Sequence, residues 1–347
     1  MTLSLTVLSQ ETKENPPEGN LLIVGGALSK SNKAVYEKFI DLAGGKENAV
    51  IGIIPLASSI PAKSAMRFKN DLREYGVSAG NINIIPLAFK DDKSTDDIDE
   101  SEWAKNADNV EVVRLIQRCT GIWFTGGDQY RITKTLINEN GSWTSSLKAI
   151  WEKYYVGAVI GGTSAGAAVM SDIMIAGGSS FDALDKGFTD EYSSSEQQEY
   201  GPLFTSKGIN FFKHGIIDQH FDKKARHARL VVALYENKEQ YPVGFGIDEN
   251  TAMWVNPQDG IMQVIGEGGV TILDVSDAKR KEIKRQYAYN NIIVNYLTFE
   301  DIYHFDTKEI TLNVRKRKTT GREYFHIEKA SRTGIFTTYS SFSSLIS

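Results

Sequence analysis

Short, uninterrupted apolar segments recur along the first half of this chain and constrain its fold more than any other feature. They lie at 21–24, 50–55, 82–86, 121–124 and 157–160. Segments with helical spacing of apolar residues separate them, notably Lys33 to about Ala43 and Lys63 to Tyr75. Strands buried on both faces lack polar alternation, and alternation of strands with helices indicates parallel crossovers. The pattern predicts an α/β fold: a doubly wound, mostly parallel sheet with helices on both faces.

The pattern changes after Gly244. Short strand-like pieces separated by glycine turns follow, at 252–255, 260–265, 270–273, 302–305 and 310–314. We expect additional C-terminal strands and hairpins packed on the main sheet rather than an independent domain. The chain then divides into a polar N-terminal arm (1–19), one α/β domain (20–314) and a basic, Ser/Thr-rich extension (315–347). The acidic, polar segment 91–109 is expected to be a surface excursion.

The composition excludes several classes of protein. The 347 residues include 39 Lys and Arg against 44 Asp and Glu, and a formal charge of -5 does not favour a general nucleic-acid binder. No apolar run approaches the roughly 20 residues that cross a bilayer, and residues 1–19 lack the features of a secretion signal. The single cysteine, Cys119, excludes an intrachain disulfide and a cysteine-based zinc site. We therefore expect a cytoplasmic protein with no membrane or nucleic-acid partner.

The pentapeptide GTSAG at 162–166 fits the pattern G-x-S-x-G, with a buried strand before it and a helix-compatible run after it. A sharp turn from strand to helix needs small neighbours, and it projects the Ser164 hydroxyl out of the sheet. It also leaves the backbone N–H of Ala165 in position to hold an oxyanion. The sequence predicts that Ser164 is a nucleophile; the alternative is a glycine-rich turn with a serine cap.

A serine nucleophile needs a base, and the base needs a carboxylate that orients it. His220 ends an apolar, strand-like segment with a polar cluster, so we choose it as the general base; His214 and His227 fit structural roles better. Asp248 and Glu249 follow another strand-like segment. We choose Glu249 as the orienting acid and Asp248 as the second choice, although a polar turn explains the pair equally well.

Two more segments carry candidate binding groups. Lys224, Arg226 and Arg229 follow His220, and the two arginines are spaced to share a helix face, where they could hold substrate carboxylates. Gly127, Asp128 and Gln129 follow the apolar segment at 121–124. Glycines there let the backbone approach a ligand, and the two polar side chains can bind it; the alternative is a helix start capped by Asp128.

Taken together, five short motifs in this order resemble the cyanophycinases, which belong to the wider S51 family of serine peptidases that includes aspartyl dipeptidase. The resemblance covers residues from about 20 to about 314. The motifs are VGGAL at 24–28, FTGGDQ at 124–129, GGTSAGA at 161–167, IDQHF at 217–221 and GIDENTA at 246–252.

The resemblance implies a fold like that of class I glutamine amidotransferases, of the flavodoxin-like kind, and a Ser–His–Glu site without metal or cofactor. It also implies a peptide substrate. Cyanophycin is a polyaspartate chain with an arginine on each side chain, and the family releases β-Asp-Arg dipeptides from it. Another β-aspartyl peptide is the alternative substrate. We also expect a homodimer.

The family's catalytic residues fall on Ser164, His220 and Glu249, and an oxyanion hole is expected from the N–H groups of Ala165 and Gly127. Its substrate-binding residues fall on a further set: Asp128, Gln129, Asp218, Gln219, Arg226 and Arg229, with Lys224 standing where cyanophycinases usually carry arginine.

Two alternative functions remain at this level. The first is an aspartyl or isoaspartyl dipeptidase of the same family. The second is a glutaminase-like or non-catalytic member of the fold. Ser164 argues against a glutaminase, because such enzymes use a cysteine thiolate at this position.

Overall fold

A computed structural model of the protein describes residues 16–95, 98–192, 195–283 and 286–315. Its largest element is a nine-stranded sheet in the order β17-β16-β11-β10-β1-β5-β4-β2-β3. Five neighbouring strands run parallel: β1 (Leu21–Val24), β5 (Val159–Thr163), β4 (Gly121–Phe124), β2 (Ile51–Ile54) and β3 (Ile82–Ile84). The apolar segments of the sequence form these strands, so the predicted fold class is confirmed.

The C-terminal strands extend this sheet beyond β1, each antiparallel to its neighbour. They are β10 (Thr251–Asn256), β11 (Ile261–Gly266), β16 (Ile302–His304) and β17 (Ile310–Thr311). The expectation of additional strands on the main sheet is therefore right for these four elements.

Helices cover both faces of the sheet, and the side chains of β1 show how the layers divide. Leu21 and Ile23 belong to one apolar cluster, whereas Leu22 and Val24 belong to the other, as the two-residue period of a strand requires. The first cluster packs against α4 (Val110–Gln117), α6 (Ser145–Tyr155) and α7 (Ala165–Ala168); the second packs against α1 (Lys33–Leu42) and α3 (Pro61–Glu74).

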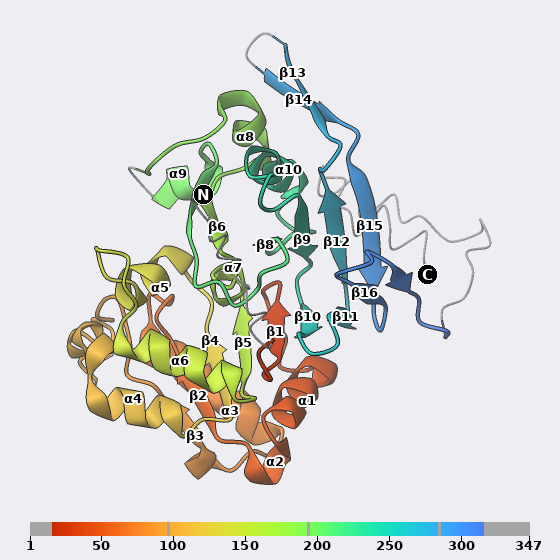
Figure 1. The fold of residues 1–347 in the computed structure, drawn as a ribbon. Coiled ribbons are helices and arrows are strands. Elements are labelled where there is room, and N and C mark those ends of the chain that lie inside the picture. The colour runs from red at the N-terminus through yellow and green to blue at the C-terminus, as the bar shows by residue number, and fades with distance from the viewer. Residues whose placement is uncertain (1–15, 96–97, 193–194, 284–285, 316–347) are drawn as a thin grey trace, which may run out of the picture.

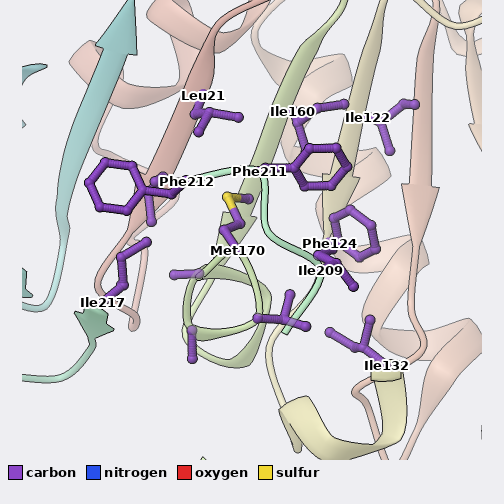
Figure 2. Packing of buried hydrophobic residues seen from close by; sticks show 14 of the residues in the cluster. Leu21, Ile122, Phe124, Ile132, Ile160, Met170, Ile209, Phe211, Phe212 and Ile217 are labelled. Atoms are coloured by element: carbon purple, nitrogen blue, oxygen red, sulfur yellow. The ribbon is translucent and has the colours of Figure 1, made fainter. Parts of the chain in front are cut away.

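The core beneath α7 is built mainly of large apolar side chains. Figure 2 shows Phe124, Ile160, Met170 and Phe211 lying together in this layer. All of them are almost fully buried. The short helix α7 therefore rests on a rigid base directly behind the residue that precedes it, Ser164.

A second sheet carries the segment 270–273, which was expected on the main sheet, together with three further strands. Its order is β15-β12-β9-β8, with β8 and β9 parallel and the other pairs antiparallel. Figure 1 shows it beside the main sheet. The strands are β8 (Ile216–Asp218), β9 (Val243–Ile247), β12 (Gly269–Asp274) and β15 (Ile293–Thr298), and α8 (Ser180–Lys186) and α10 (His227–Glu236) lie near them.

The remaining elements are short. Two antiparallel ribbons are formed by β6 (Ile173–Gly177) with β7 (Phe204–Lys207) and by β13 (Lys279–Ile283) with β14 (Gln286–Asn290), and the second projects from the body of the molecule (Figure 1). The other helices are α2 (Gly45–Asn48), α5 (Gln129–Leu136), α8 and α9 (Ser195–Tyr200), with 3-10 turns at Ala79–Asn81 and Glu102–Asp108.

The acidic segment 91–109 is anchored more firmly than a surface excursion. The Glu100 side chain is fully buried, and its carboxylate accepts hydrogen bonds from the backbone N–H groups of Ala62 and Asp92. Most of the expected N-terminal arm and nearly all of the 315–347 extension lie outside the described residues. Over the described part of the chain, no helix combines the length and apolar character of a membrane span.

Candidate active site

Ser164 occupies a sharp turn between β5 and α7. Its backbone has φ 54° and ψ -112°, a strained conformation for a residue with a side chain. Small neighbours make the turn possible. A Cβ on Gly162 would lie 2.5 Å from the Gly166 carbonyl oxygen, and one on Gly166 would lie 2.4 Å from the Phe124 carbonyl oxygen. The G-x-S-x-G pattern thus reflects backbone contact on both sides of the serine.

His220 follows β8, and its imidazole reaches the serine. The Ser164 Oγ lies 2.8 Å from His220 Nε2, so the two atoms share a hydrogen bond. Gly26, at the end of β1, makes room for this ring. A Cβ on Gly26 would lie 2.3 Å from His220 Cε1, and its φ of +117° also favours glycine.

Glu249 lies on the other side of the imidazole. Its Oε1 is 2.6 Å from His220 Nδ1, while its backbone N–H donates to Asp222 at 3.0 Å. The three side chains therefore form a continuous chain from Ser164 Oγ through the ring to a carboxylate. This is the geometry in which a neutral imidazole accepts the serine proton and the carboxylate stabilises the imidazolium.

Asp248, the second choice for the orienting acid, faces elsewhere. Its Oδ2 accepts hydrogen bonds from the Tyr296 hydroxyl at 2.8 Å and the Gly269 N–H at 3.0 Å, both from the second sheet. Burial, followed by the nearby Asp222, raises the pKa of Asp248 to about 7. Two adjacent carboxyl groups thus have different environments, and Glu249 is the one that meets His220.

The surroundings keep the imidazole neutral. Burial lowers the pKa of His220, and the nearby cations Arg226 and Lys224 lower it further, although the hydrogen bond to Glu249 opposes them. A lowered pKa leaves the ring unprotonated, and able to act as a base, at neutral pH.

Two backbone N–H groups lie beside the serine. Ala165 is the first residue of α7, and Gly127 follows β4 with a φ of +143°. A Cβ on Gly127 would lie 2.1 Å from the Ala57 carbonyl oxygen, so the position requires glycine. In the described ranges neither N–H donates to a backbone acceptor, and Gly127 lines a cavity beside Ser164.

Several predicted binding residues line a cavity of about 120 Å³ next to Ser164. Asp128 caps α5 through the Tyr130 N–H and also lines this cavity, so both sequence-based interpretations apply to it. Gln129 lines it while donating to the Ile175 carbonyl at 2.8 Å. The Gln219 Oε1 lies 3.4 Å from Ser164 Oγ.

Arg229 and Asp218 were both predicted to bind substrate, but in the structure they bind each other. The Arg229 guanidinium binds both carboxylate oxygens of Asp218 and also donates to the Gly178 carbonyl. Both side chains are almost completely buried. This bidentate pair fixes the end of β8, and hence the start of the His220 loop, because its charges satisfy each other.

Arg226 precedes α10 as its N-cap rather than lying within the helix. It donates to the Gln219 carbonyl at 2.8 Å, and burial together with Arg229 lowers the pKa of Arg226 to about 10. Lys224 is more exposed and forms an ion pair with Glu199 at 2.6 Å. Of the predicted cations, Lys224 is therefore the one most open to a ligand.

The sequence analysis missed Gln198 and Glu199, which line the same cavity from α9. Gln198 donates to Asp128 Oδ1 at 3.3 Å and to the Ala176 carbonyl at 3.1 Å. Burial acts to raise the pKa of Glu199, yet the pairing with Lys224 holds that pKa below its usual range. The only signal was a polar insertion before α9, and insertion alone does not indicate a site.

A second cavity, of about 380 Å³, lies on the other side of Ser164 and also includes His220. The serine thus stands between two cavities, one small and lined by charged groups, the other larger and lined partly by aromatic rings. Among the described residues, no group of three or more His, Cys, Asp or Glu side chains is arranged to hold a metal ion.

Comparison with known proteins extends this description. Residues 21–263 match the model of the family described as Peptidase family S51. The chain is 34% identical over 257 residues to a cyanophycinase from Geminocystis herdmanii (strain PCC 6308), covering 74% of this chain and 80% of the relative. It is 29% identical over 315 residues to one from Synechococcus elongatus, covering 89% and 86%.

A solved structure supports the fold. The crystal structure of a peptidase from an acI-B1 Actinobacterium superposes with a TM-score of 0.52 at 20% identity, covering 81% of this chain and 97% of that one.

Proposed function

Because the chain belongs to peptidase family S51 and is a serine-type peptidase, we propose that it hydrolyses cyanophycin to β-Asp-Arg dipeptides through Ser164, His220 and Glu249. The observation that carries the proposal is the continuous contact from Ser164 Oγ to His220 Nε2 at 2.8 Å and from His220 Nδ1 to Glu249 Oε1 at 2.6 Å. The relatives named above as cyanophycinases supply the substrate class.

The proposed mechanism gives each of these three side chains a role. His220 takes the proton of Ser164 as Oγ attacks the scissile carbonyl carbon, and Glu249 stabilises the resulting imidazolium. The N–H groups of Ala165 and Gly127 donate to the oxyanion. His220 then gives its proton to the leaving amine, and water, deprotonated by the same ring, cleaves the acyl-enzyme ester.

The small cavity supports release of a terminal unit. It holds about 120 Å³, and Gln198 and Glu199 of α9 form part of its wall. It offers cations at Lys224 and Arg226 as well as anions at Asp128 and Glu199. A β-Asp-Arg unit also carries both signs of charge, so each can find an opposite partner there. We propose that such units are released from one end of the chain, as in an exopeptidase.

The test is to incubate the purified protein with soluble cyanophycin and identify the products by mass spectrometry. We expect β-Asp-Arg from the wild type and a loss of several orders of magnitude in kcat for Ser164→Ala, as for other serine nucleophiles. The exposed serine variant Ser142→Ala serves as control and should keep wild-type activity.

Parallel assays with α-Asp dipeptides and isoaspartyl peptides separate the proposal from an aspartyl or isoaspartyl dipeptidase. Turnover of those peptides without any release from cyanophycin would contradict the proposed substrate, and wild-type turnover by Ser164→Ala would contradict the nucleophile. The cytoplasmic location and the homodimer stay predictions.

A further inference from the structure

The larger cavity beside Ser164 has no role in the mechanism above, although it borders the same hydroxyl and the same imidazole. It holds about 380 Å³, roughly three times the volume of the smaller cavity. Helices α1 and α3 and the ends of β4 and β5 supply its walls. The side chains that carry the argument are Tyr36, Arg67, Phe68, Asp71, Trp123 and Thr125.

Aromatic rings form one part of this cavity. Phe68 and Trp123 stack with centroids 4.4 Å apart and planes 16° apart, and Tyr36 lies 5.8 Å from Phe68. The rings are nearly all buried against the sheet, so they are held in place. These rings give the cavity a fixed aromatic wall, and aromatic groups close to a carboxylate favour a cation.

Asp71 supplies an anion next to these rings. Its Oδ2 accepts a hydrogen bond from the Tyr36 hydroxyl at 2.9 Å, and among the described residues no cation forms an ion pair with it. Burial raises the pKa of Asp71, and the Tyr36 hydrogen bond only partly offsets that effect. The nearby cations Lys30 and Arg67 also lower this pKa, but neither forms an ion pair with Asp71 in the described part of the chain, so an incoming cation in direct contact would stabilise the carboxylate further.

Other polar groups in the cavity also lack partners. Thr125 is 4% exposed, and its hydroxyl, like that of the neighbouring Thr163, has no hydrogen-bond partner within the described ranges. Arg67 lies four residues before Asp71 on the same face of α3 and is exposed. The cavity therefore presents an anion, a cation and unpaired hydroxyl groups around an aromatic surface.

We propose that this cavity binds the arginyl side chain of the cyanophycin unit across the scissile bond from the released dipeptide, with its guanidinium on Asp71. The inference rests on the proposed function, since it takes cyanophycin as the substrate. In that polymer the arginine is joined to aspartate through its α-amine, so it keeps both a guanidinium and a carboxylate. The guanidinium lies beside the aromatic wall, and the carboxylate faces Arg67. The greater volume accommodates a unit from which the polymer continues.

The mimic for the test is Nα-acetyl-L-arginine, which carries the same guanidinium, carboxylate and amide. Trp123 lines the larger cavity, and no tryptophan is among the described residues that line the smaller one, so tryptophan fluorescence reports on the proposed site. We expect saturable binding to Ser164→Ala, with Kd about tenfold weaker when Asp71→Asn is added. Asparagine still accepts the Tyr36 hydrogen bond, which limits damage to the fold.

Two controls sharpen the comparison. Glu74→Gln removes an exposed carboxylate from the same helix and should leave Kd unchanged. Nα-acetyl-L-citrulline replaces the guanidinium by a neutral group of similar shape, and its affinity should be weak and the same with or without Asp71→Asn. Absent arginine binding, equal Kd values for the two proteins, or citrulline binding as tight as arginine would each overturn the inference.

Hydrolysis assays keep this inference distinct from the proposed function. In a protein with Ser164 intact, Asp71→Asn should raise KM for a fragment of two β-Asp-Arg units about tenfold and leave kcat nearly unchanged. If no protein releases β-Asp-Arg, the proposed function fails, yet the binding comparison still decides what the cavity accepts. If release proceeds with the same KM in wild type and Asp71→Asn, the inference fails and the proposed function stands.

Discussion

The main sheet and the second sheet hold their parts of the site in different ways. Ser164, on the main sheet, is fixed by local backbone contact, because the glycines two residues away on either side let neighbouring backbone come within van der Waals distance. His220 and Glu249, which follow strands of the second sheet, are fixed by hydrogen bonds to a distant segment. The His220 N–H donates to the Gly25 carbonyl at 2.6 Å.

The end of β1 connects the two arrangements. Besides the contact between Gly25 and His220, two more hydrogen bonds meet here. The Gly26 carbonyl accepts one from the Asn250 N–H at 2.8 Å, and the Val24 carbonyl accepts one from the Ser164 N–H at 3.0 Å. One short strand end therefore sets the relative positions of all three loops. The contrast teaches that the nucleophile depends on its own turn as well as on this junction, whereas its partners depend on the junction.

Gly26→Ala should break the junction and have the largest effect. The added Cβ would lie 2.3 Å from His220 Cε1 at a φ of +117°, so the imidazole must leave the serine. We expect kcat to fall by about 10⁵, close to the loss of a catalytic histidine. Steady-state kinetics on cyanophycin measures it, with circular dichroism to confirm folding.

The matched control is Gly44→Ala. Gly44 has a similar φ of +109°. Its added Cβ, however, would lie 3.6 Å from the nearest atom, the Cβ of Asn48, which is an ordinary contact. It should cost some stability and almost no activity. Equal losses of activity in both variants would mean that backbone strain, rather than the space beside His220, explains the effect.

Substitution of the two carboxyl groups that follow β9, Glu249 and Asp248, gives the next largest expected effect on kcat. Glu249→Gln leaves His220 Nδ1 without its carboxylate, and we expect kcat to fall by roughly 10³–10⁴. Asp248→Asn changes a group that faces Tyr296 instead, so kcat should change by less than about threefold. The same assay measures both, and a larger loss for Asp248→Asn would reverse the assignment of the acid.

The contrast between sheets also explains how far the sequence could be interpreted. The parallel strands were predictable because burial on both faces leaves unbroken apolar segments, as at 21–24 and 121–124. The turn at Ser164 was predictable because its requirements are local. The placement of strands β8, β9, β12 and β15 in a separate sheet was not, because their apolar segments look the same whichever sheet they join.

The sequence also could not reveal roles that depend on partners far away along the chain. The spacing of Arg226 and Arg229 indicated a shared helix face, but only the fold shows that Asp218 takes the Arg229 guanidinium. Likewise, nothing in the local sequence distinguishes Asp248 from Glu249. Their difference arises from Tyr296 and Gly269, which lie 48 and 21 residues away from Asp248 along the chain.

The smallest predicted effect concerns Lys224, the most exposed of the predicted cations near His220. Its charge helps to lower the pKa of His220, although burial is the larger cause. Lys224→Met removes that cation and leaves Glu199 with only its longer contact to Arg226, at 3.8 Å, and both changes favour the imidazolium. The pKa of His220 should therefore rise, and the acid limb of the pH profile should move to higher pH.

Because Lys224 is partly exposed and its field is screened, we expect a shift of only a few tenths of a pH unit in the profile of kcat/KM, which reports the free enzyme. Lys186→Met makes the same charge change on α8, where it pairs with Asp182, and should leave the acid limb in place. A shift to lower pH in Lys224→Met, or an equal shift in both variants, would contradict the direct effect of the Lys224 charge on His220 and leave the second sheet's backbone contacts as what sets the imidazole's environment.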